Sequence, residues 1–252
     1  MSNESPGEIL ECISNALEQN GALARAIVSS WREAFLSPIA ETLAIRPFRD
    51  IIKRKNPYLY RASGIRTIPE LVDRALSDFV SSSTEGLFGT FLEHLAISLP
   101  GNVKAPGLRV DIVRQTGGVS RLYTIKSGPA GFNSSSFEDH KRNLYEARRL
   151  VQQSPIRAEL YIGFVHGRKR TTVRTQDQIA LLSSPDLWHH LSGDPAFYRK
   201  LLLACGCLAP MYNAVQPLYD LARQRMLAEA EQLLGSGSDE VDWPVLLRLV
   251  SG

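Results

Sequence analysis

A carboxylate and an amine in the middle of the chain have the types and spacing needed for metal-assisted chemistry. Asp111 lies in the alternating segment GLRVDIVRQ, and Lys126 follows fifteen residues later in YTIKSG. If these segments pair as a hairpin, both side chains can point to one face of it. Asp111 would then bind Mg²⁺, the carbonyl of Ile125 would add a ligand, and Lys126 would position or activate a water. This arrangement suits phosphodiester hydrolysis, whereas the plain structural alternative is a cross-strand salt bridge.

Further carboxylates that could complete a metal site lie on two predicted helices. Glu85 and Glu93 are eight residues apart, near one helical face, and Glu93 interrupts the apolar sequence FLEHL. Glu138 and Asp139 open a later helix. We favour Glu93, because a carboxylate set among Phe and Leu is costly unless a cation compensates it. For Glu85 and Glu138 the alternative role is to complement a helix dipole.

The chain after Lys126 has the composition of a phosphate-binding surface. The loop SGPAGFNSSS leads into a helix, and backbone amides at a helix N-terminus bind phosphate readily. Between residues 141 and 174, nine Lys and Arg stand against two Glu, a local charge of +7. The alternatives are a Ser-rich helix cap and a solvated basic face. The candidate phosphate or base contacts are Ser127, Asn133, Ser134, Ser135, Lys141, Arg168, Lys169, Arg170 and Arg174.

Length and composition limit the classes of protein to which the chain can belong. It has 252 residues, is 44% apolar and 22% charged, and carries a net charge of +3. This is enough apolar sequence for a packed core, and no stretch approaches the roughly 18 apolar residues of a membrane span. The acidic, polar start does not resemble a secretory signal. Three cysteines at no zinc-like spacing predict neither a disulfide framework nor a Cys-rich metal site, and favour a reducing cytoplasm.

The hydrophobic periodicity indicates which elements position these residues. The first ~60 residues are helical, followed by a helix over 67–83 with Thr67 as its N-cap and a second helix over 81–102 capped by Ser83 or Thr84. A hairpin follows over 107–128, turning at TGG, and then a helix over 135–154. A strand over 158–167 leads to a basic hairpin arm over 167–175. The chain from Asp186 onward is helical, with a long helix over 218–235 closed by Gly235.

Several of these blocks, taken in order, resemble the PD-(D/E)XK nucleases. More closely, the sequence is similar to the PmeII-type family of type II restriction endonucleases. The resemblance covers roughly residues 56 to 208 and is carried by NPYLYRASG, ELVDRALSDFVSSSTEGLFGTFLEHLA, GLRVDIV, YTIKSGPAGFNSSS, ELYIGFVHGRK and WHHLSGDPAFYRKLLLACG. It implies an α/β (α+β) restriction-endonuclease-like core, a mixed β-sheet flanked by helices, with extra N- and C-terminal helices. We expect a single nuclease domain over 1–252, with a helical N-terminal part over 1–80, a catalytic core over 81–180 and a helical C-terminal part over 181–252.

The resemblance also assigns roles within the motif. Asp111 falls on its metal-binding Asp and Lys126 on its Lys, but the second acid is replaced by Thr124. Thr cannot supply the missing negative charge, so another carboxylate must: Glu93 first, with Glu85 and Glu138 as alternatives.

The implied activity is Mg²⁺-dependent hydrolysis of double-stranded DNA at a short specific sequence. The implied enzyme is a homodimer in the cytoplasm of a bacterial or archaeal cell, with no membrane partner. The alternatives are a catalytically inactive DNA-binding module of the same fold, which Thr124 favours, and a helical interaction protein that does not bind nucleic acid.

Overall fold

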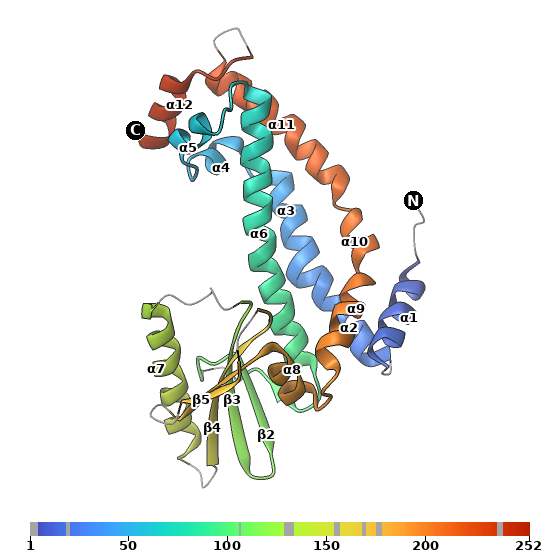
Figure 1. The fold of residues 1–252 in the computed structure, drawn as a ribbon. Helices are drawn as coiled ribbons and strands as arrows, with labels where there is room; N and C mark the ends of the chain where they lie inside the picture. Colours follow the sequence, from blue (N-terminus) through green and yellow to red (C-terminus); the bar gives the residue numbers. More distant parts are fainter. Residues whose placement is uncertain are drawn as a thin grey trace. The chain divides into compact units, whose positions relative to one another are not determined.

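The structure, a computed structural model, describes residues 5–18, 21–105, 107–128, 134–153, 157–167, 170–174, 178–235 and 239–252 (Figure 1). Of Ser134, Val173 and Arg174 it describes the backbone alone. The chain divides into two compact units. The sheet unit comprises Met1–Trp31 and Gly89–Ala209, and the helical unit comprises Arg32–Phe88 and Pro210–Gly252.

The sheet unit is built on a mixed six-stranded sheet with the order β1-β2-β3-β4-β6-β5. β3 and β4 are parallel, as are β4 and β6, while β1, β2 and β3 pair antiparallel and β5 pairs antiparallel with β6. This confirms the expected mixed sheet flanked by helices; β1 and β6 are strands that the periodicity did not predict. The strands are β1 (Asn102–Val103), β2 (Ile112–Thr116), β3 (Val119–Lys126), β4 (Arg157–Phe164), β5 (Thr172–Arg174) and β6 (Ile179–Leu182).

The predicted hairpin is confirmed as β2 and β3. Thr116 pairs with Val119, which leaves Gly117 and Gly118 as a two-residue turn. Both glycines have positive φ, +59° and +76°. A two-residue turn with this backbone matches the twist of the flanking strands, and glycine adopts it without a steric penalty.

Helices cover both faces of the sheet. On one face, Leu144 and Ala147 of α7 (Ser134–Val151) share a buried cluster with Leu122 and Ile162 of the strands. On the other face lies α8 (Ser184–Ser192), whose Leu187 packs so tightly on Gly163 that a Cβ there would lie 2.4 Å from Leu187 Cδ1. The crossover from β3 through α7 to β4 is the connection that parallel strands require (Figure 1).

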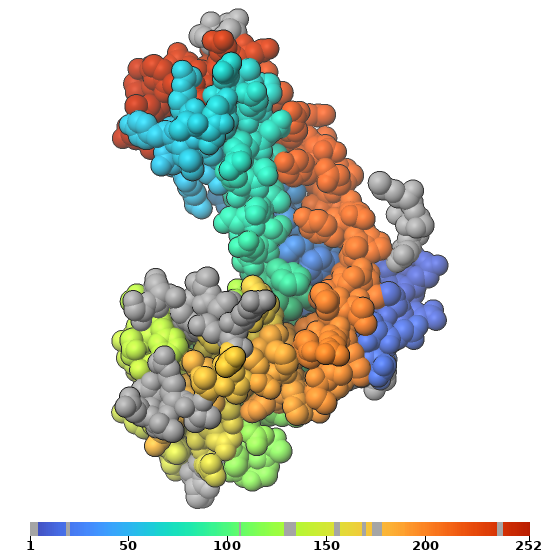
Figure 2. Space-filling model, in the orientation of Figure 1, coloured from blue at the N-terminus to red at the C-terminus, as the bar shows by residue number. Residues whose placement is uncertain are grey.

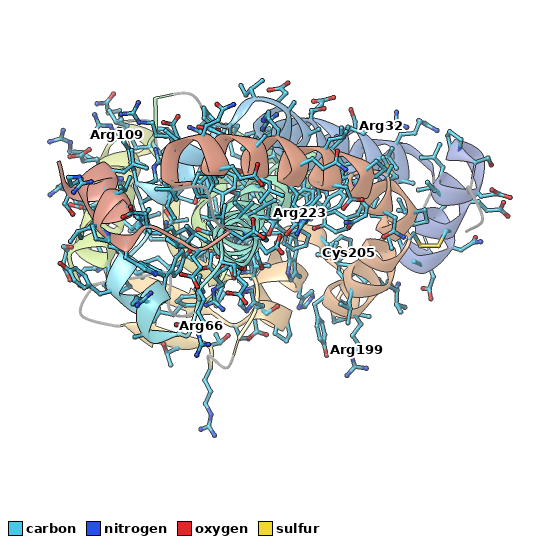
Figure 3. The ribbon with its side chains drawn as sticks, turned by 90° about the horizontal axis from the view of Figure 1, so that it is seen from above. Arg32, Arg66, Arg109, Arg199, Cys205 and Arg223 are labelled. Atoms are coloured by element: carbon cyan, nitrogen blue, oxygen red, sulfur yellow. A yellow bond between two sulfur atoms is a disulfide. The ribbon has the colours of Figure 1, made fainter. Side chains whose placement is uncertain are left out.

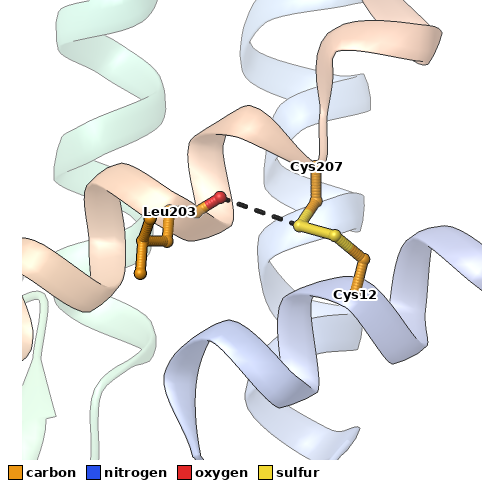
Figure 4. Close-up of a disulfide and its surroundings, with 3 residues drawn as sticks. All are labelled: Cys12, Leu203 and Cys207. Carbon is orange, nitrogen blue, oxygen red and sulfur yellow. Dashed lines mark hydrogen bonds between the residues drawn. A yellow bond between two sulfur atoms is a disulfide. The ribbon is translucent and has the colours of Figure 1, made fainter.

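Three helices from distant parts of the sequence complete the sheet unit: α1 (Pro6–Leu17), α2 (Gly21–Trp31) and α9 (Phe197–Gly206). α1 packs against both α2 and α9. Cys12 on α1 forms a disulfide with Cys207 at the end of α9, with a Cα–Cα distance of 5.9 Å (Figure 4). Cys207 Sγ also lies 3.7 Å from the carbonyl oxygen of Leu203. The structure thus differs from the expectation that the cysteines form no disulfide, because sequence spacing does not show which residues a fold brings together.

The helical unit contains η1 (Arg32–Leu36), α3 (Ser37–Ile45), α4 (Phe48–Ile52), α5 (Pro57–Ala62), most of α10 (Ala209–Asn213), α11 (Gln216–Leu234) and α12 (Trp243–Ser251). Glu229 of α11 accepts the backbone N–H groups of Phe48 and Arg49 at 2.7 and 3.2 Å, where a carboxylate complements the N-terminus of α4. Arg223 of α11, labelled in Figure 3, makes two hydrogen bonds to Asp73, at 2.6 and 3.0 Å. α12 packs against α5 (Figure 2).

One helix, α6 (Ile68–Ser98), spans the region in which two helices were expected. Thr67 caps it as predicted: its hydroxyl accepts the Glu70 N–H at 3.4 Å, and its own N–H donates to the Glu70 carboxylate at 3.1 Å. The predicted second cap at Ser83 or Thr84 is wrong. The Thr84 hydroxyl instead donates to the carbonyl oxygen of Val80 at 2.9 Å, a bond that a helix interior accommodates.

The two units interleave along the sequence. Residues 68–88 of α6 belong to the helical unit and residues 89–98 to the sheet unit, while α1 and α2 join the sheet unit from the N-terminal end. The three consecutive parts expected from the sequence do not follow this division. That a single nuclease domain spans residues 1–252 remains a prediction.

Among the helices of the described residues, no single one is long and apolar enough to cross a membrane. Phe197–Asn213 and Gln216–Leu234 together, as a bent pair, have the length and composition to do so.

Candidate active site

Asp111 lies immediately before β2, where the backbone leaves the ladder. Its N–H donates to the carbonyl oxygen of Tyr123 at 2.9 Å, and its carboxylate accepts the Ile125 N–H at 2.7 Å. Arg109, two residues earlier and labelled in Figure 3, has a φ of +43°, a left-handed conformation that is uncommon for a residue other than glycine. The Asp111 side chain therefore satisfies a β3 amide beyond the end of β2. Asp111 was expected within a strand, but it lies one residue before β2 begins.

The register of the hairpin fixes which face of the sheet carries these residues. Ile112 pairs with Tyr123, so Asp111 lies opposite Thr124. Side chains alternate along a strand, which places Asp111, Thr124 and Lys126 on the face covered by α7. Thr124 is only 1% exposed and pairs with Ile162 of β4. The position that carries the motif's second acid is thus a buried, uncharged side chain beside Asp111.

Lys126 is held at the carboxyl end of β3. The carbonyl oxygen of Lys126 accepts the Val165 N–H at 2.8 Å, and that of Ser127 accepts the His166 N–H at 3.0 Å. The β3–β4 pairing therefore continues past both strands. On the opposite face, Arg121 of β3 bonds Glu159 of β4 at 3.1 Å. These contacts fix the backbone that carries Lys126.

The charges around Asp111 bring three predicted site residues together. Burial raises the pKa of Asp111, the hydrogen bond from Ile125 lowers it, and the negative charge of Glu93 raises it again. The ammonium groups of Lys104 and Lys126 lower this pKa. Asp111, Glu93 and Lys126 therefore share one electrostatic environment, into which the fold also brings Lys104.

Glu93 and Lys104 form an ion pair on the edge of an open pocket. Glu93 lies near the end of α6, and Lys104 directly follows β1. Their side chains are 31% and 50% exposed, so the pair is in contact with solvent. The pocket has a volume of about 410 Å³ and is also lined by Ser30, His94, Ile97 and Ser98. Lys104 carries no sequence signal of its own, because only the fold places it beside Glu93.

The other two candidate carboxylates lie in more exposed places. Glu138 lies just after the first turn of α7, its side chain is 65% exposed, and it pairs with Lys141 at 3.2 Å. Glu85 is exposed and belongs to the helical unit. Of the three candidates, Glu93 is the one whose charge shifts the pKa of Asp111.

The carboxylates present fit a magnesium ion that keeps much of its water. In the described part of the chain, no group of three or more His, Cys, Asp or Glu side chains converges on one point. Mg²⁺ is commonly bound by one or two carboxylates, with waters and substrate phosphates filling the other positions. Asp111, Glu93 and the carbonyl of Ile125 are oxygen donors of the kind this ion prefers.

Two histidines lie close to Lys126 and the residues that follow it. His140 of α7 has its pKa lowered by burial and by the positive charge of Lys126, which places it near that ammonium. The His166 ring packs on Gly128, where an added Cβ would lie 2.7 Å from its Cε1. Neither contact has a signal in the spacing of these residues.

The structure describes only some of the residues that were predicted to contact phosphate. Ser127 and Arg170 are exposed, Ser135 is exposed in the first turn of α7, and the Lys141 side chain is 14% exposed. Asn133, Arg168 and Lys169 lie outside the described residues, and the side chains of Ser134 and Arg174 are not described. The assignment of these residues to DNA remains a prediction.

Comparison with known proteins gives the family. A family model for the type II restriction endonuclease EcoO109I matches residues 21–212, more than half of the chain. No curated protein matches the sequence. The matched family is a restriction endonuclease family, as the sequence predicted, but it is not the PmeII-type family. The match includes the hairpin with Asp111 and Lys126, the Glu93 segment of α6 and helices of both units. The chain belongs to the EcoO109I family of type II restriction endonucleases.

Proposed function

We propose that the protein hydrolyses phosphodiester bonds of double-stranded DNA at a short specific sequence, with Mg²⁺ as its cofactor. The observation that carries this proposal is the placement of Asp111 and Lys126 on one face of the sheet, with the charge of Glu93 acting on Asp111. The family supplies the class of reaction, and the site supplies residues suited to it. We also propose, as the sequence resemblance implies, that the protein is related to the PmeII-type enzymes.

Each residue of the site has a distinct role in the proposed reaction. Asp111 and Glu93, with the carbonyl of Ile125, would hold the ion, and Asp111 is already oriented by the Ile125 N–H. A bound Mg²⁺ would polarise the scissile phosphate and lower the pKa of a water. Lys126 would orient the attacking water through its Nζ and stabilise negative charge that develops on the phosphate oxygens. Thr124 contributes no charge, so Glu93 takes the place of the acid in the motif.

The DNA backbone would be bound by residues around the end of β3 and the start of α7. Ser127, Asn133, Ser134, Ser135 and Lys141 would contact phosphates near the cleaved bond. Arg168, Lys169, Arg170 and Arg174 would contact phosphates or guanine edges farther along the duplex. A contact with phosphate makes binding sensitive to salt, whereas a contact with a base edge makes it sensitive to sequence.

One specific observation favours a second function, a DNA-binding module without catalysis. Thr124 is buried beside Asp111, at the position of the second acid, and supplies no ligand charge. If Glu93 does not replace that acid, divalent ions would bind weakly and DNA would be bound without being cut.

Digestion of several bacteriophage DNAs separates the two functions. The purified protein is incubated with each DNA in Mg²⁺ or in EDTA, beside the matched variant Asp111→Asn. We expect discrete fragments in Mg²⁺ alone, and none with Asp111→Asn. Intact DNA from every phage, together with salt-sensitive DNA binding that Asp111→Asn leaves unchanged, would establish the inactive module instead.

We further propose that the enzyme acts as a homodimer in the cytoplasm of a bacterial or archaeal cell. A chain with one candidate site cuts both strands of a two-fold symmetric sequence most simply as a pair. Light scattering should therefore give about twice the 28.0 kDa chain mass. A monomeric mass both with and without DNA would contradict the dimer.

A further inference from the structure

The ion pair between Glu93 and Lys104 conflicts with the role proposed for Glu93. A carboxylate that binds a divalent cation cannot at the same time keep a lysine ammonium against its oxygen atoms. Lys104 contacts Glu93 directly, and both charges act on Asp111. Lys104 therefore places a positive charge against one candidate ligand, Glu93, and its charge acts on the other, Asp111.

The ion pair between Glu93 and Lys104 is one in which another cation can replace the lysine. Exposed ion pairs contribute little to stability, so a partner with higher charge can replace the lysine at small cost. The backbone of Lys104 directly follows Val103, which pairs with Val113 of β2. The flexible stem of the lysine can swing from this fixed point, and the pocket of about 410 Å³ beside it offers room for the movement.

We propose that Lys104 is an exchangeable counter-ion of the candidate metal site. In the free protein it neutralises Glu93 next to Asp111; when a divalent cation binds Glu93, Lys104 releases that carboxylate and binds a DNA phosphate. This inference rests on the proposed function, because it takes Glu93 as a metal ligand. Its consequence is that metal binding and DNA binding support each other through a residue outside the motif.

Metal affinity without DNA tests the first half of the proposal. Isothermal titration with Mn²⁺ should show Lys104→Met binding the ion about three- to tenfold more tightly than the unmodified protein, because the ion no longer displaces an ammonium. Lys104→Arg keeps the charge and should bind Mn²⁺ like the unmodified protein. Glu93→Gln and the double variant Glu93→Gln/Lys104→Met should bind Mn²⁺ weakly and equally.

The matched control is Lys200→Met. Lys200 also forms ion pairs in the sheet unit, but with Glu18 and Asp194, at 2.7 and 2.9 Å. Removing it should leave Mn²⁺ affinity unchanged. Circular dichroism verifies that each variant is folded, which is expected for Lys104→Met because half of that side chain is exposed.

The salt dependence of DNA binding tests the second half. Binding of a duplex that contains the mapped cleavage site is measured in Ca²⁺ over a range of KCl concentrations. The slope of log K against log salt should fall by about one for Lys104→Met, the change expected when one phosphate contact is lost. An unchanged slope would overturn the transfer of Lys104 to DNA.

The outcomes separate this inference from the proposed function. If Lys104→Met binds Mn²⁺ no more tightly than the unmodified protein, while that protein cuts DNA in Mg²⁺, the exchange is overturned and the nuclease function stands. If neither protein binds Mn²⁺ and neither cuts DNA, both proposals fall. Tighter binding in Lys104→Met that disappears in the double variant supports the exchange.

Discussion

At the scale of single residues, the Asp111 carboxylate has both a structural and a chemical role. It accepts the Ile125 N–H at 2.7 Å, which ties the start of β2 to the end of β3. Burial raises its pKa, so the protein holds the charged form at some cost unless a cation compensates it. Lys104 and Lys126 supply part of that compensation. A divalent cation would complete it, which is the physical reason for placing the metal here.

Lys126 is the residue whose removal should separate binding from catalysis. Lys126→Ala should keep its affinity for cognate DNA in Ca²⁺ but lose cleavage in Mg²⁺ by at least about a hundredfold, because the attacking water loses its orienting ammonium. Single-turnover cleavage and fluorescence anisotropy measure the two quantities. The matched control is Lys200→Ala, which removes a lysine paired with Glu18 and Asp194 and should bind and cut normally. Cleavage by Lys126→Ala at the unmodified rate would sink its assigned role.

At the scale of elements, alternation and turn chemistry predicted the hairpin that carries the site. Period-two patterning placed Asp111 near Lys126, and a Gly-Gly turn set the register. The Thr67 cap was also predicted, because the residues around Thr67 fit one local role, that of a helix N-cap. The hydroxyls of Ser83 and Thr84 led to the prediction of a helix boundary that does not exist. A hydroxyl can either cap a helix or donate to a carbonyl oxygen within its own helix, and only tertiary packing decides between the two.

The candidate site was predictable where it depends on neighbours in sequence, and unpredictable where it depends on packing. The strand pattern indicated Asp111 and Lys126, and the apolar surroundings of Glu93 indicated a compensating cation. In the structure, the cation that forms an ion pair with Glu93 is Lys104, which the sequence did not indicate. The contact of His166 with Gly128 was likewise hidden, because it requires the parallel pairing of β3 with β4.

The N-terminus of α8 gives a pH-dependent prediction at the same scale. The Ser183 hydroxyl donates to Asp186 at 2.6 Å and the Thr171 hydroxyl also donates to it, and these bonds lower the pKa of Asp186 below its usual 3.8. A lowered folded-state pKa stabilises the fold above the unfolded pKa, and this stabilisation is lost as pH falls through the folded value.

Asp186→Asn should therefore melt about 1–3 °C lower than the unmodified protein at pH 7, a small effect because Asp186 is only partly buried. The difference should shrink as the pH falls below about 4 and close below the native pKa of Asp186. Thermal melts followed by circular dichroism across this range measure it. A difference that stays constant down to the most acid pH would contradict a role for the charge.

At the scale of the whole molecule, a disulfide joins distant parts of the sequence within the sheet unit. Cys12 and Cys207 are 195 residues apart, so closing this loop removes much of the freedom of the unfolded chain. Burial raises the pKa of the remaining thiol, Cys205, to about 11, which keeps that thiol protonated and unreactive.

Cys12→Ser should lower the free energy of unfolding by about 2–5 kcal/mol in oxidising buffer and have little effect in dithiothreitol. Denaturant titrations in the two buffers measure this difference. Cys205→Ser is the matched control: it keeps the disulfide, so its stability should change between the two buffers as that of the unmodified protein does. Equal stability of Cys12→Ser and the unmodified protein after oxidation would show that the disulfide does not constrain the chain.

The proposed catalytic centre depends most on Glu93, because the motif lacks its second acid at Thr124. The decisive measurement is the single-turnover cleavage rate of Glu93→Gln on a mapped site in Mg²⁺. Binding to the same duplex is measured in Ca²⁺, with Glu138→Gln as the matched control. We predict that Glu93→Gln cuts at least about a hundredfold more slowly while still binding the duplex, and that Glu138→Gln cuts normally. Cleavage by Glu93→Gln at the unmodified rate would contradict the account.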